Sequence, residues 1–231
     1  MGTLNSTRSW FPFLVLTREP SLHKIFYTTI QLMLFYILYI NENKQVLYLY
    51  QNHANIFVIG GKKMIIDTNL DDFKLRLAER KDVPLILEFI KELADYEKML
   101  DEVVATEEIL TESLFEKKAA EVVIGEYQNK PVAFALFFHN FSTFLGRPGI
   151  YLEDLYVKPE MRGKGIGKMM LSFLAHLCVE RKCGRLEWWC LDWNEPSIQF
   201  YKKMGAVPMD EWTVYRVTGD ALDQLAAEFN R

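Results

Sequence analysis

A short glycine-rich segment at residues 162–167, with the sequence Arg-Gly-Lys-Gly-Ile-Gly, has the composition of an anion-binding loop. It follows an apolar, strand-like run from Ile150 to Val157 and precedes an amphipathic, helix-like run. Glycines allow a tight turn and a close approach of a ligand to the backbone, while unpaired N–H groups and the positive end of the helix dipole favour negative charge. The segment therefore predicts a backbone cradle for a pyrophosphate at the start of a helix.

The spacing of the glycines separates the known phosphate-binding motifs. A Walker loop needs a glycine, four residues and then Gly-Lys-Ser/Thr, and the dinucleotide fingerprint needs G-x-G-x-x-G; neither pattern matches. The pattern that matches is R-x-x-G-x-G after a strand that reads Tyr-Leu-Glu-Asp-Leu-Tyr-Val at residues 151–157. This arrangement resembles the coenzyme A loop of the GNAT superfamily of N-acetyltransferases.

Two further blocks, in the matching order, make the resemblance more specific. Residues 193–206 (WNEPSIQFYKKMGA) resemble the segment that ends the coenzyme A site in the polyamine branch of the superfamily. Residues 90–99 (IKELADYEKM) resemble the first helix of that branch, and the similarity as a whole covers roughly residues 73–217. The chain is most similar to the spermidine/spermine (diamine) N-acetyltransferases and the thialysine acetyltransferases.

The resemblance implies that acetyl-CoA is the cosubstrate. Three segments are expected to contact the coenzyme: the end of the central strand, the glycine loop with the first helical turn, and the start of a later short helix. Backbone groups of the strand would hold the pantetheine arm and the thioester carbonyl. The expected contacts are Leu155, Tyr156, Val157, Arg162, Gly163, Lys164, Gly165, Ile166, Gly167, Lys168, Asn194, Glu195, Pro196, Ser197 and Tyr201. Asn194 also has the position of a helix N-cap.

Two neighbouring carboxylates, Glu153 and Asp154, precede the loop and could act on a substrate amine. An aliphatic amine has a pKa near 10.4, so at neutral pH only about one molecule in a thousand is the free base that attacks a thioester. Strand alternation predicts that the two side chains point to opposite faces, so that one faces the cleft. The resemblance implies that Glu153 contacts the amine and helps to deprotonate it. For each residue the alternative is a strand-end carboxylate paired with a lysine.

The departing thiolate of coenzyme A also requires a proton. The resemblance places Tyr201 near the coenzyme sulfur, where it would act as the general acid. From the residues alone, a core tyrosine beside Phe200 is the simpler interpretation.

Recognition of a polyamine requires carboxylates along a groove, one for each distant ammonium. The residues that resemble the substrate contacts of the branch are Tyr96, Glu97, Glu153, Glu187, Trp188, Trp189 and Glu211. The chain departs from the branch pattern in two places. Glu211 aligns only with a gap, and the two tryptophans are bulkier than the usual residues there. These tryptophans either narrow the groove for a shorter amine, hold an ammonium by a cation–π contact, or simply pack on the strand.

The elements that must position these residues alternate between strand and helix patterns from Phe73 onward. Strands are predicted over 73–78, 121–127, 132–139, 150–157, 185–191 and 212–217, and helices over 85–96, 106–117, 165–182 and 196–204. The 165–182 helix carries an apolar stripe that predicts packing on a sheet rather than a ligand site. The stripe consists of Ile166, Met169, Met170, Phe173, Leu174, Leu177 and Cys178.

The predicted fold class is therefore α/β, with helices flanking a central mixed sheet. The GNAT resemblance implies that the sheet is mostly antiparallel and that its fourth and fifth strands splay apart at the coenzyme A site.

Residues 1–71 are predicted to form a leader that the resemblance does not reach, and residues 72–231 the N-acetyltransferase domain. Within the leader, Ile25 to Ile40 is uncharged and close to the minimum length for a membrane span, and basic residues precede it. Its threonines, glutamine and tyrosines argue against a span, and no small-residue cleavage site follows it. Three interpretations stay open: an extension unrelated to the fold with Met64 as the true start, a membrane anchor, or a docking segment.

Composition is that of a folded protein, since 231 residues with 50% hydrophobic content exclude a disordered chain. Residues 72–231 contain 21 Lys and Arg against 27 Asp and Glu, which argues against nucleic-acid binding and suits a cationic substrate. An ordinary acidic surface explains the charge equally well. The cysteines Cys178, Cys183 and Cys190 match no disulfide or zinc pattern, and the four histidines lack ligand spacing. We therefore expect reduced thiols, no metal and a cytoplasmic location.

These features predict an acetyl-CoA-dependent N-acetyltransferase that acts by direct transfer in a ternary complex. The expected acceptor is a primary amine of a small di- or polyamine or of a lysine-like molecule. A protein N-acetyltransferase and a non-catalytic coenzyme A-binding sensor or scaffold are the alternatives. A homodimer is expected from the resemblance alone, and membrane contact is expected only if Ile25 to Ile40 inserts.

Overall fold

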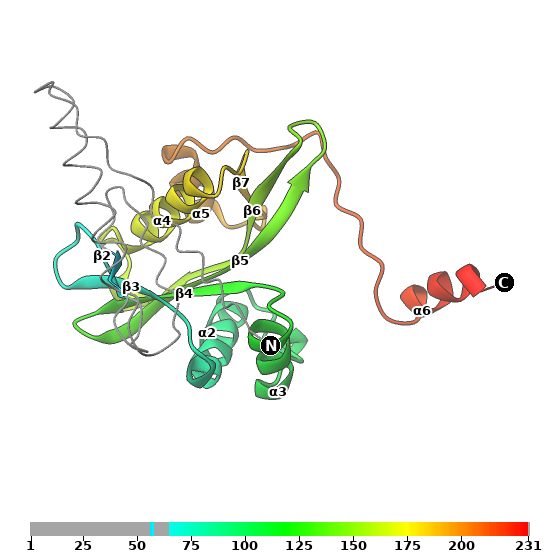
Figure 1. The fold of residues 1–231 in the computed structure, drawn as a ribbon, viewed down its shortest axis with the longest axis horizontal. Coiled ribbons are helices and arrows are strands. Elements are labelled where there is room, and N and C mark those ends of the chain that lie inside the picture. Colours follow the sequence, from blue (N-terminus) through cyan, green and yellow to red (C-terminus); the bar gives the residue numbers. More distant parts are fainter. Residues whose placement is uncertain (1–55, 58–64, 231) are drawn as a thin grey trace, which may run out of the picture. The chain divides into compact units, whose positions relative to one another are not determined.

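The computed structural model describes residues 56–57 and 65–230, whose strands form a single seven-stranded sheet (Figure 1). Each strand of this sheet lies beside its neighbours in sequence. The strands are β1 (Ile56–Phe57), β2 (Ile65–Asp67), β3 (Phe73–Leu77), β4 (Glu121–Tyr127), β5 (Lys130–Ser142), β6 (Arg147–Val157) and β7 (Leu186–Trp188). Adjacent strands are antiparallel except β6 and β7, which are parallel. The prediction of a mixed, mostly antiparallel sheet is confirmed.

Helices cover both faces of the sheet, with α2 and α3 on one face and α4 and α5 on the other (Figure 1). The α-helices are α2 (Val83–Tyr96), α3 (Glu107–Leu110), α4 (Ile166–Glu180), α5 (Glu195–Lys203) and α6 (Asp220–Ala227). A π-helical turn (Thr111–Glu116) extends α3, and short 3-10 turns lie at Arg80–Asp82, Leu100–Glu102, Pro159–Met161 and Glu228–Asn230. The predicted helices at 85–96, 165–182 and 196–204 are thus confirmed.

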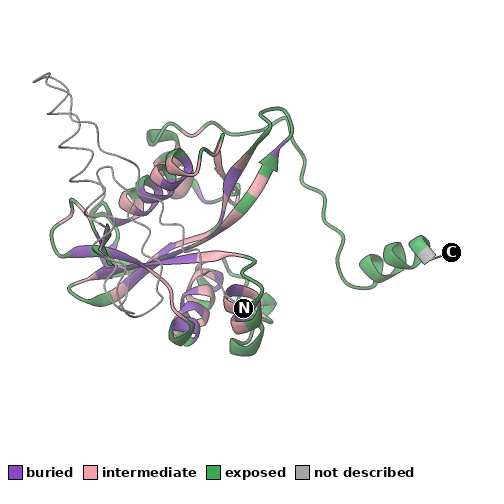
Figure 2. Cartoon of the chain, in the orientation of Figure 1, coloured by how far each residue is buried: buried purple, intermediate pink, exposed green. Residues whose placement is uncertain are grey.

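Burial follows the two layers (Figure 2). The apolar stripe of α4 packs in one core cluster with the strands, as predicted, and six of its seven residues are buried while Met169 is partly buried. A second cluster lies between α2, α3 and the opposite face of the sheet, where Phe89 stacks on Phe134. These two cores fix the positions of the helix ends that carry the candidate site residues.

A β-bulge interrupts β6 at the two carboxylates. Leu152 pairs with Phe137 on β5, whereas Asp154 pairs with Leu136, so Glu153 is an extra residue in the ladder. Phe137 belongs to the α4-side core and Leu136 packs against the α2-side core, so Leu152 and Asp154 lie on opposite faces. Strict alternation would put residues two apart on the same face. Strict alternation, on which the expectation for Glu153 and Asp154 rests, therefore does not hold across this bulge.

The sheet splits at its β7 edge. β6 and β7 pair only from Ile150 to Leu152 on β6 and from Leu186 to Trp188 on β7. β6 continues to Val157, whereas the chain after Trp188 leaves the strand. The expected splay of the fourth and fifth strands of the family's sheet is confirmed, with β6 and β7 in those places.

Two segments differ from the sequence-based expectation. Residues 212–217 form no strand, and side chains 207–229 are exposed, so the predicted final strand is wrong; helix α6 follows it without having been predicted. An alternating pattern produces a strand only where a neighbouring strand bonds to it, and no such neighbour lies beside 212–217 in the described residues. At the other end, β2 lies within the predicted leader, and its Ile66 is buried in the α4-side core.

The uncharged run from Ile25 to Ile40 lies outside the described residues. Of the helices that the structure describes, none combines the length and the hydropathy that a bilayer crossing requires.

Candidate active site

The glycine loop lies between β6 and α4, as predicted. Gly163 and Gly165 have φ values of +77° and +83°, a left-handed conformation that strains other residues. Gly165 is the N-cap of the 15-residue helix α4, and no side chain caps the helix or adds a carboxylate to its first turn. A Cβ atom at Gly163 would meet nothing within 4 Å, so the backbone is open to a ligand there. The first N–H groups of α4 therefore remain available to an anion such as a pyrophosphate.

Basic side chains of the loop are fixed by aromatic rings. The Arg162 guanidinium lies 4.8 Å from the centre of the Tyr96 ring, and its Nε donates to the Val157 carbonyl at 3.0 Å. The Lys164 ammonium lies 5.4 Å from the centre of the Tyr127 ring. These contacts add positive charge near the cradle and join the loop to α2, where Tyr96 lies.

Helix α5 begins with the predicted N-cap. The buried side chain of Asn194 accepts a hydrogen bond from the Ser197 N–H at 3.4 Å and another from the Tyr96 hydroxyl at 3.1 Å. Pro196 occupies the first turn, where it suits a helix start. Asn194 therefore holds the end of α2 against the start of α5 through its side-chain oxygen.

Tyr201 lies on α5 in an aromatic environment. Its ring centre is 4.9 Å from that of Trp188 and 5.4 Å from that of Phe200, and Phe200 in turn faces Gly167 at the start of α4. Burial raises the pKa of Tyr201 to about 12, and the charges of Cys190 and Glu97 act in the same direction. The hydroxyl is therefore protonated at neutral pH, as a proton donor must be. Trp188 is partly buried and packs against the core cluster on the α4 side of the sheet.

Two carboxylates, Asp154 and Glu97, are linked to these residues electrostatically, because the charge of Glu97 acts on both Asp154 and Tyr201. Burial raises the pKa of Asp154 to about 7, and the neighbouring charges of Glu153 and Glu97 add to the effect. Burial also raises the pKa of Glu97, which caps the C-terminal end of α2. Within the part of the chain that the structure describes, neither Asp154 nor Glu97 forms an ion pair. The arrangement is complementary to a cation that no described residue supplies.

The other predicted substrate residues form a second group further along the sheet edge. Trp189 is exposed and packs edge-on against Tyr151, with ring centres 5.7 Å apart. The charges of Glu153 and Glu187 reinforce the effect of burial in raising the pKa of Tyr151. Glu187 is already engaged, because it accepts from Asn140 at 2.7 Å and contacts Arg185 at 2.7 Å.

Glu211 lies in the exposed segment 207–229, and no ion pair of Glu211 occurs among the described residues. The structure therefore brings Tyr96, Glu97 and Tyr201 together, places Glu153, Glu187 and Trp189 beside them along β6 and β7, and leaves Glu211 apart.

Three residues that the charges of predicted site residues act on were not selected from the sequence as site residues: Asp154, Cys190 and Tyr151. Asp154 was considered only as the neighbour of Glu153. Its surroundings depend on the bulge, which no residue pattern predicts. Cys190 follows β7, and its pKa is raised by burial and by the charges of Glu97 and Asp192. Tyr151 is the first residue of the strand motif at residues 151–157. Its place in that motif is the signal that could have identified it.

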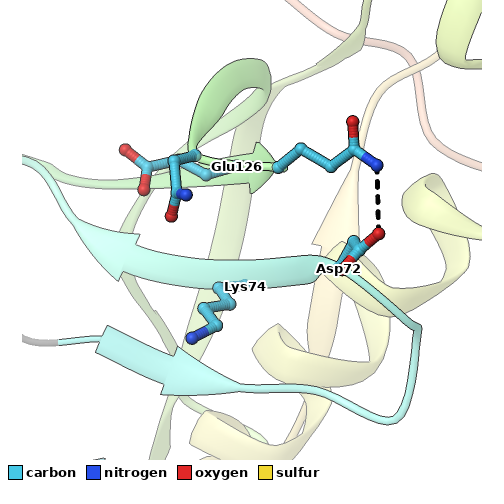
Figure 3. A pocket seen from close by; sticks show the side chains of 5 residues that line it. Asp72, Lys74 and Glu126 are labelled. Atoms are coloured by element: carbon cyan, nitrogen blue, oxygen red, sulfur yellow. Dashed lines mark hydrogen bonds between the residues drawn. The ribbon is translucent and has the colours of Figure 1, made fainter.

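A small polar pocket lies elsewhere, between β3 and β4 (Figure 3). It is lined by Asp72, Lys74, Glu126, Gln128 and Asn129, and the Gln128 side-chain amide donates to Asp72 at 3.0 Å. None of the predicted site residues lines it.

Comparisons with known proteins agree with this geometry. Residues 87–206 match the family model described as the acetyltransferase (GNAT) family. The chain is 36% identical over 166 residues to a thialysine N-epsilon-acetyltransferase of Bos taurus, covering 67% of this chain and 97% of that protein. It is 31% identical over 198 residues to the L-ornithine N5-acetyltransferase NATA1 of Arabidopsis thaliana, covering 66% and 87%. An integron cassette protein from V. cholerae has a similar solved structure, with a TM-score of 0.58, 26% identity, and coverage of 67% of this chain and 98% of that one.

Proposed function

The chain belongs to the acetyltransferase (GNAT) family, and on this premise we propose that it transfers the acetyl group of acetyl-CoA to a primary amine of a small di- or polyamine or a lysine-like molecule. The amine attacks the thioester directly, with both substrates bound. Relatives named for thialysine and L-ornithine support an acceptor that carries a side-chain amine.

The observation that carries this proposal is the carboxylate pair beside the tyrosine. Asp154 and Glu97 are desolvated and have no cationic partner among the described residues, and the charge of Glu97 also acts on Tyr201. An ammonium group relieves the repulsion between two such carboxylates. An amine bound there is held next to the residue that can protonate the leaving thiolate.

Acetyl-CoA would lie in the splay between β6 and β7, with its pyrophosphate on the glycine loop. The backbone of Leu155, Tyr156 and Val157 is free of β7 and can bond to the pantetheine arm. The remaining contacts come from 162–168 and from Asn194 to Ser197, and they include the first turns of α4 and α5. The left-handed glycines and the uncapped start of α4 fit a pyrophosphate.

The proposed substrate contacts are Tyr96 and Glu97 near the reacting amine, and Glu153, Glu187, Trp188, Trp189 and Glu211 further out. Tyr201 is the proposed general acid, and the carboxylate that takes the proton of the amine comes from the end of β6, where the resemblance assigns this role to Glu153. A substrate with two cationic groups could place one of them near Tyr96 and Glu97 and the other near the outer residues along β6 and β7.

We also propose that the protein is a homodimer located in the cytoplasm. The exposed apolar side chains of 207–229 and the short edge strand β7 support self-association. The three cysteines are free thiols, which is the state expected in a reducing compartment.

The test is thiol release from acetyl-CoA by the purified full chain with spermidine, putrescine, thialysine, L-ornithine and lysine, and with a histone-tail peptide as control. We expect turnover with a small amine and an acetylated product by mass spectrometry. Turnover with the peptide alone would instead identify a protein acetyltransferase. Binding of coenzyme A without turnover on any amine would identify a sensor.

A further inference from the structure

We propose that Tyr96 is a positioning residue of the acetyl-CoA site. It holds the glycine loop and the start of α5, the two helix starts expected to bind the coenzyme, in fixed places relative to the end of α2. The inference rests on the proposed function and deepens it, because it names a residue outside those two segments that sets the affinity for the coenzyme.

The hydroxyl of Tyr96 sets the orientation of the Asn194 side chain. The Ser197 N–H can only donate, so the amide oxygen of Asn194 must face it, at 3.4 Å. The Tyr96 hydroxyl donates to the same oxygen at 3.1 Å. Asn194 is buried, and its amide nitrogen donates to no acceptor among the described residues. The two hydrogen bonds to the oxygen therefore leave this nitrogen as the group that can donate to the pantetheine arm.

The ring of Tyr96 restrains Arg162 of the glycine loop. The guanidinium lies 4.8 Å from the centre of this ring and 5.8 Å from the centre of the Tyr156 ring. Its Nε donates to the Val157 carbonyl, and its two terminal nitrogens form no hydrogen bond within the described residues. A guanidinium held in this way can bind a phosphate oxygen with a smaller loss of conformational freedom.

Tyr96 can hold both segments because its own position is fixed. It is the last residue of α2, which packs in the α2-side core, and its ring centre lies 6.0 Å from that of Trp193, the residue before Asn194. One side chain therefore contacts the glycine loop and the start of α5 from a third element. The next residue is Glu97, a proposed contact of the amine, so Tyr96 also fixes the coenzyme segments relative to the acceptor side.

Loss of the hydroxyl alone should weaken coenzyme binding without disrupting the site. In Tyr96→Phe the ring contacts with Arg162 and Trp193 remain, and the Asn194 oxygen keeps its hydrogen bond from the Ser197 N–H. No buried group loses its last partner, so the cost is that of one hydrogen bond, or about three- to tenfold in affinity. A hydroxyl that only contacted the substrate would instead change KM for the amine.

The experiment measures the dissociation constant of coenzyme A by calorimetry in the full chain, in Tyr96→Phe, in Asn194→Ala and in the double variant. Tyr96→Phe should weaken binding about three- to tenfold. Tyr96→Leu, which also removes the ring from Arg162, should weaken it about two- to fivefold more. In the Asn194→Ala background, Tyr96→Phe should change the affinity less than about twofold, because the group through which the hydroxyl acts is gone. Tyr215→Phe, at an exposed position, is the control.

Steady-state kinetics separates positioning from catalysis. In Tyr96→Phe, KM for acetyl-CoA should rise by about the same factor as the dissociation constant, while kcat changes less than about twofold. Far-UV circular dichroism shows that each variant is folded.

The proposal is overturned if Tyr96→Phe binds coenzyme A as tightly as the unaltered protein, or if its effect is undiminished in the Asn194→Ala background. A change confined to KM for the amine also overturns it, because Tyr96 would then be a substrate contact only. Failure of the proposed function would look different. The unaltered protein would then acetylate no amine, and the calorimetric comparison would still decide the role of Tyr96, whereas an unaltered protein that binds no coenzyme A would overturn both.

Discussion

Tyr201 is held by ring contacts that do not involve its hydroxyl, which makes it suitable for a clean substitution. Tyr201→Phe keeps the packing on Trp188 and Phe200 and removes only the hydroxyl, which is the proposed proton donor. We expect kcat to fall about 100-fold or more, with a small change in KM for the amine. Steady-state kinetics at pH 7.5 checks this, and Tyr215→Phe, at an exposed position, is the matched control. Equal losses in both variants would show that Tyr201 is not the acid.

Asp154 should reduce the stability of the protein in a pH-dependent way. Its folded-state pKa lies above the ordinary aspartate value, so folding favours the protonated form. The stabilisation that the folded state gains from protonation of Asp154 is complete below about pH 4. It is lost as the pH rises through about 7. Asp154→Asn removes this partly buried charge and should therefore be more stable than the unaltered protein by a few kcal/mol at pH 7.5, since one pKa unit corresponds to about 1.4 kcal/mol. The gain should shrink towards pH 4.

Urea unfolding at pH 4.5 and pH 7.5 measures the difference, with the exposed Asp210→Asn as control. A gain that does not change between the two pH values would contradict the raised pKa. A partly buried carboxylate that reduces stability in this way is typical of a functional position.

At the scale of elements, the start of α4 depends on a single left-handed residue. Gly165→Ala places a Cβ at φ +83°, which costs about 1–2 kcal/mol and shifts the N–H groups that would hold the pyrophosphate. We expect KM for acetyl-CoA to rise about tenfold or more, with KM for the amine nearly unchanged. Gly146→Ala carries similar strain at φ +61° in the turn between β5 and β6, outside the site. If both variants weaken acetyl-CoA equally, the loop is not the cofactor cradle.

A buried ion network joins β3, β4 and the start of α2. Arg76 donates to Asp82 at 2.8 Å and to Glu126 at 2.8 Å, and the side chains of all three residues are buried. Arg76→Leu leaves two buried carboxylates without this guanidinium, so we expect the free energy of unfolding to fall by about 3–5 kcal/mol. Arg80→Leu is the matched control, because its ion pair with Glu116 is exposed and contributes less than about 1 kcal/mol. Urea unfolding distinguishes the two.

The elements also show how far the sequence determines the structure. Helix α4 could be predicted in full, because its stripe of apolar residues recurs at the helical period and packs on the sheet as that period requires. The glycine loop could be predicted because left-handed turns need glycine. The bulge at Glu153 could not, since it shifts the ladder by one residue without a proline or glycine to mark it. The environment of Asp154 therefore became visible only in three dimensions.

At the scale of the whole molecule, the C-terminal segment 207–229 is exposed and packs little against the rest of the described chain. Its apolar side chains are exposed, and Trp212 and Tyr215 retain 68% and 90% of their accessible surface. Residues 212–217 have the composition of a strand but no neighbour to pair with, while β7, at the edge of the sheet, pairs only with β6 among the described residues. In a dimer with a two-fold axis, residues 212–217 of each copy can pair with the β7 edge strand of the other copy. This pairing would cover the exposed apolar side chains and the sheet edge together.

We therefore expect the full chain to sediment as a dimer, and a chain that ends at Ala206 to sediment as a monomer. A chain that ends at Gly219 keeps residues 212–217 and lacks α6, so it should remain dimeric and serves as the control. Sedimentation equilibrium over a hundredfold range of concentration measures the association constant of each. A monomeric full chain would remove the support for the homodimer, whereas a dimer that survives truncation at Ala206 would place the interface elsewhere on the sheet and helices. The same three chains can be assayed for kcat/KM. A change on truncation at Ala206 would show that activity depends on this segment.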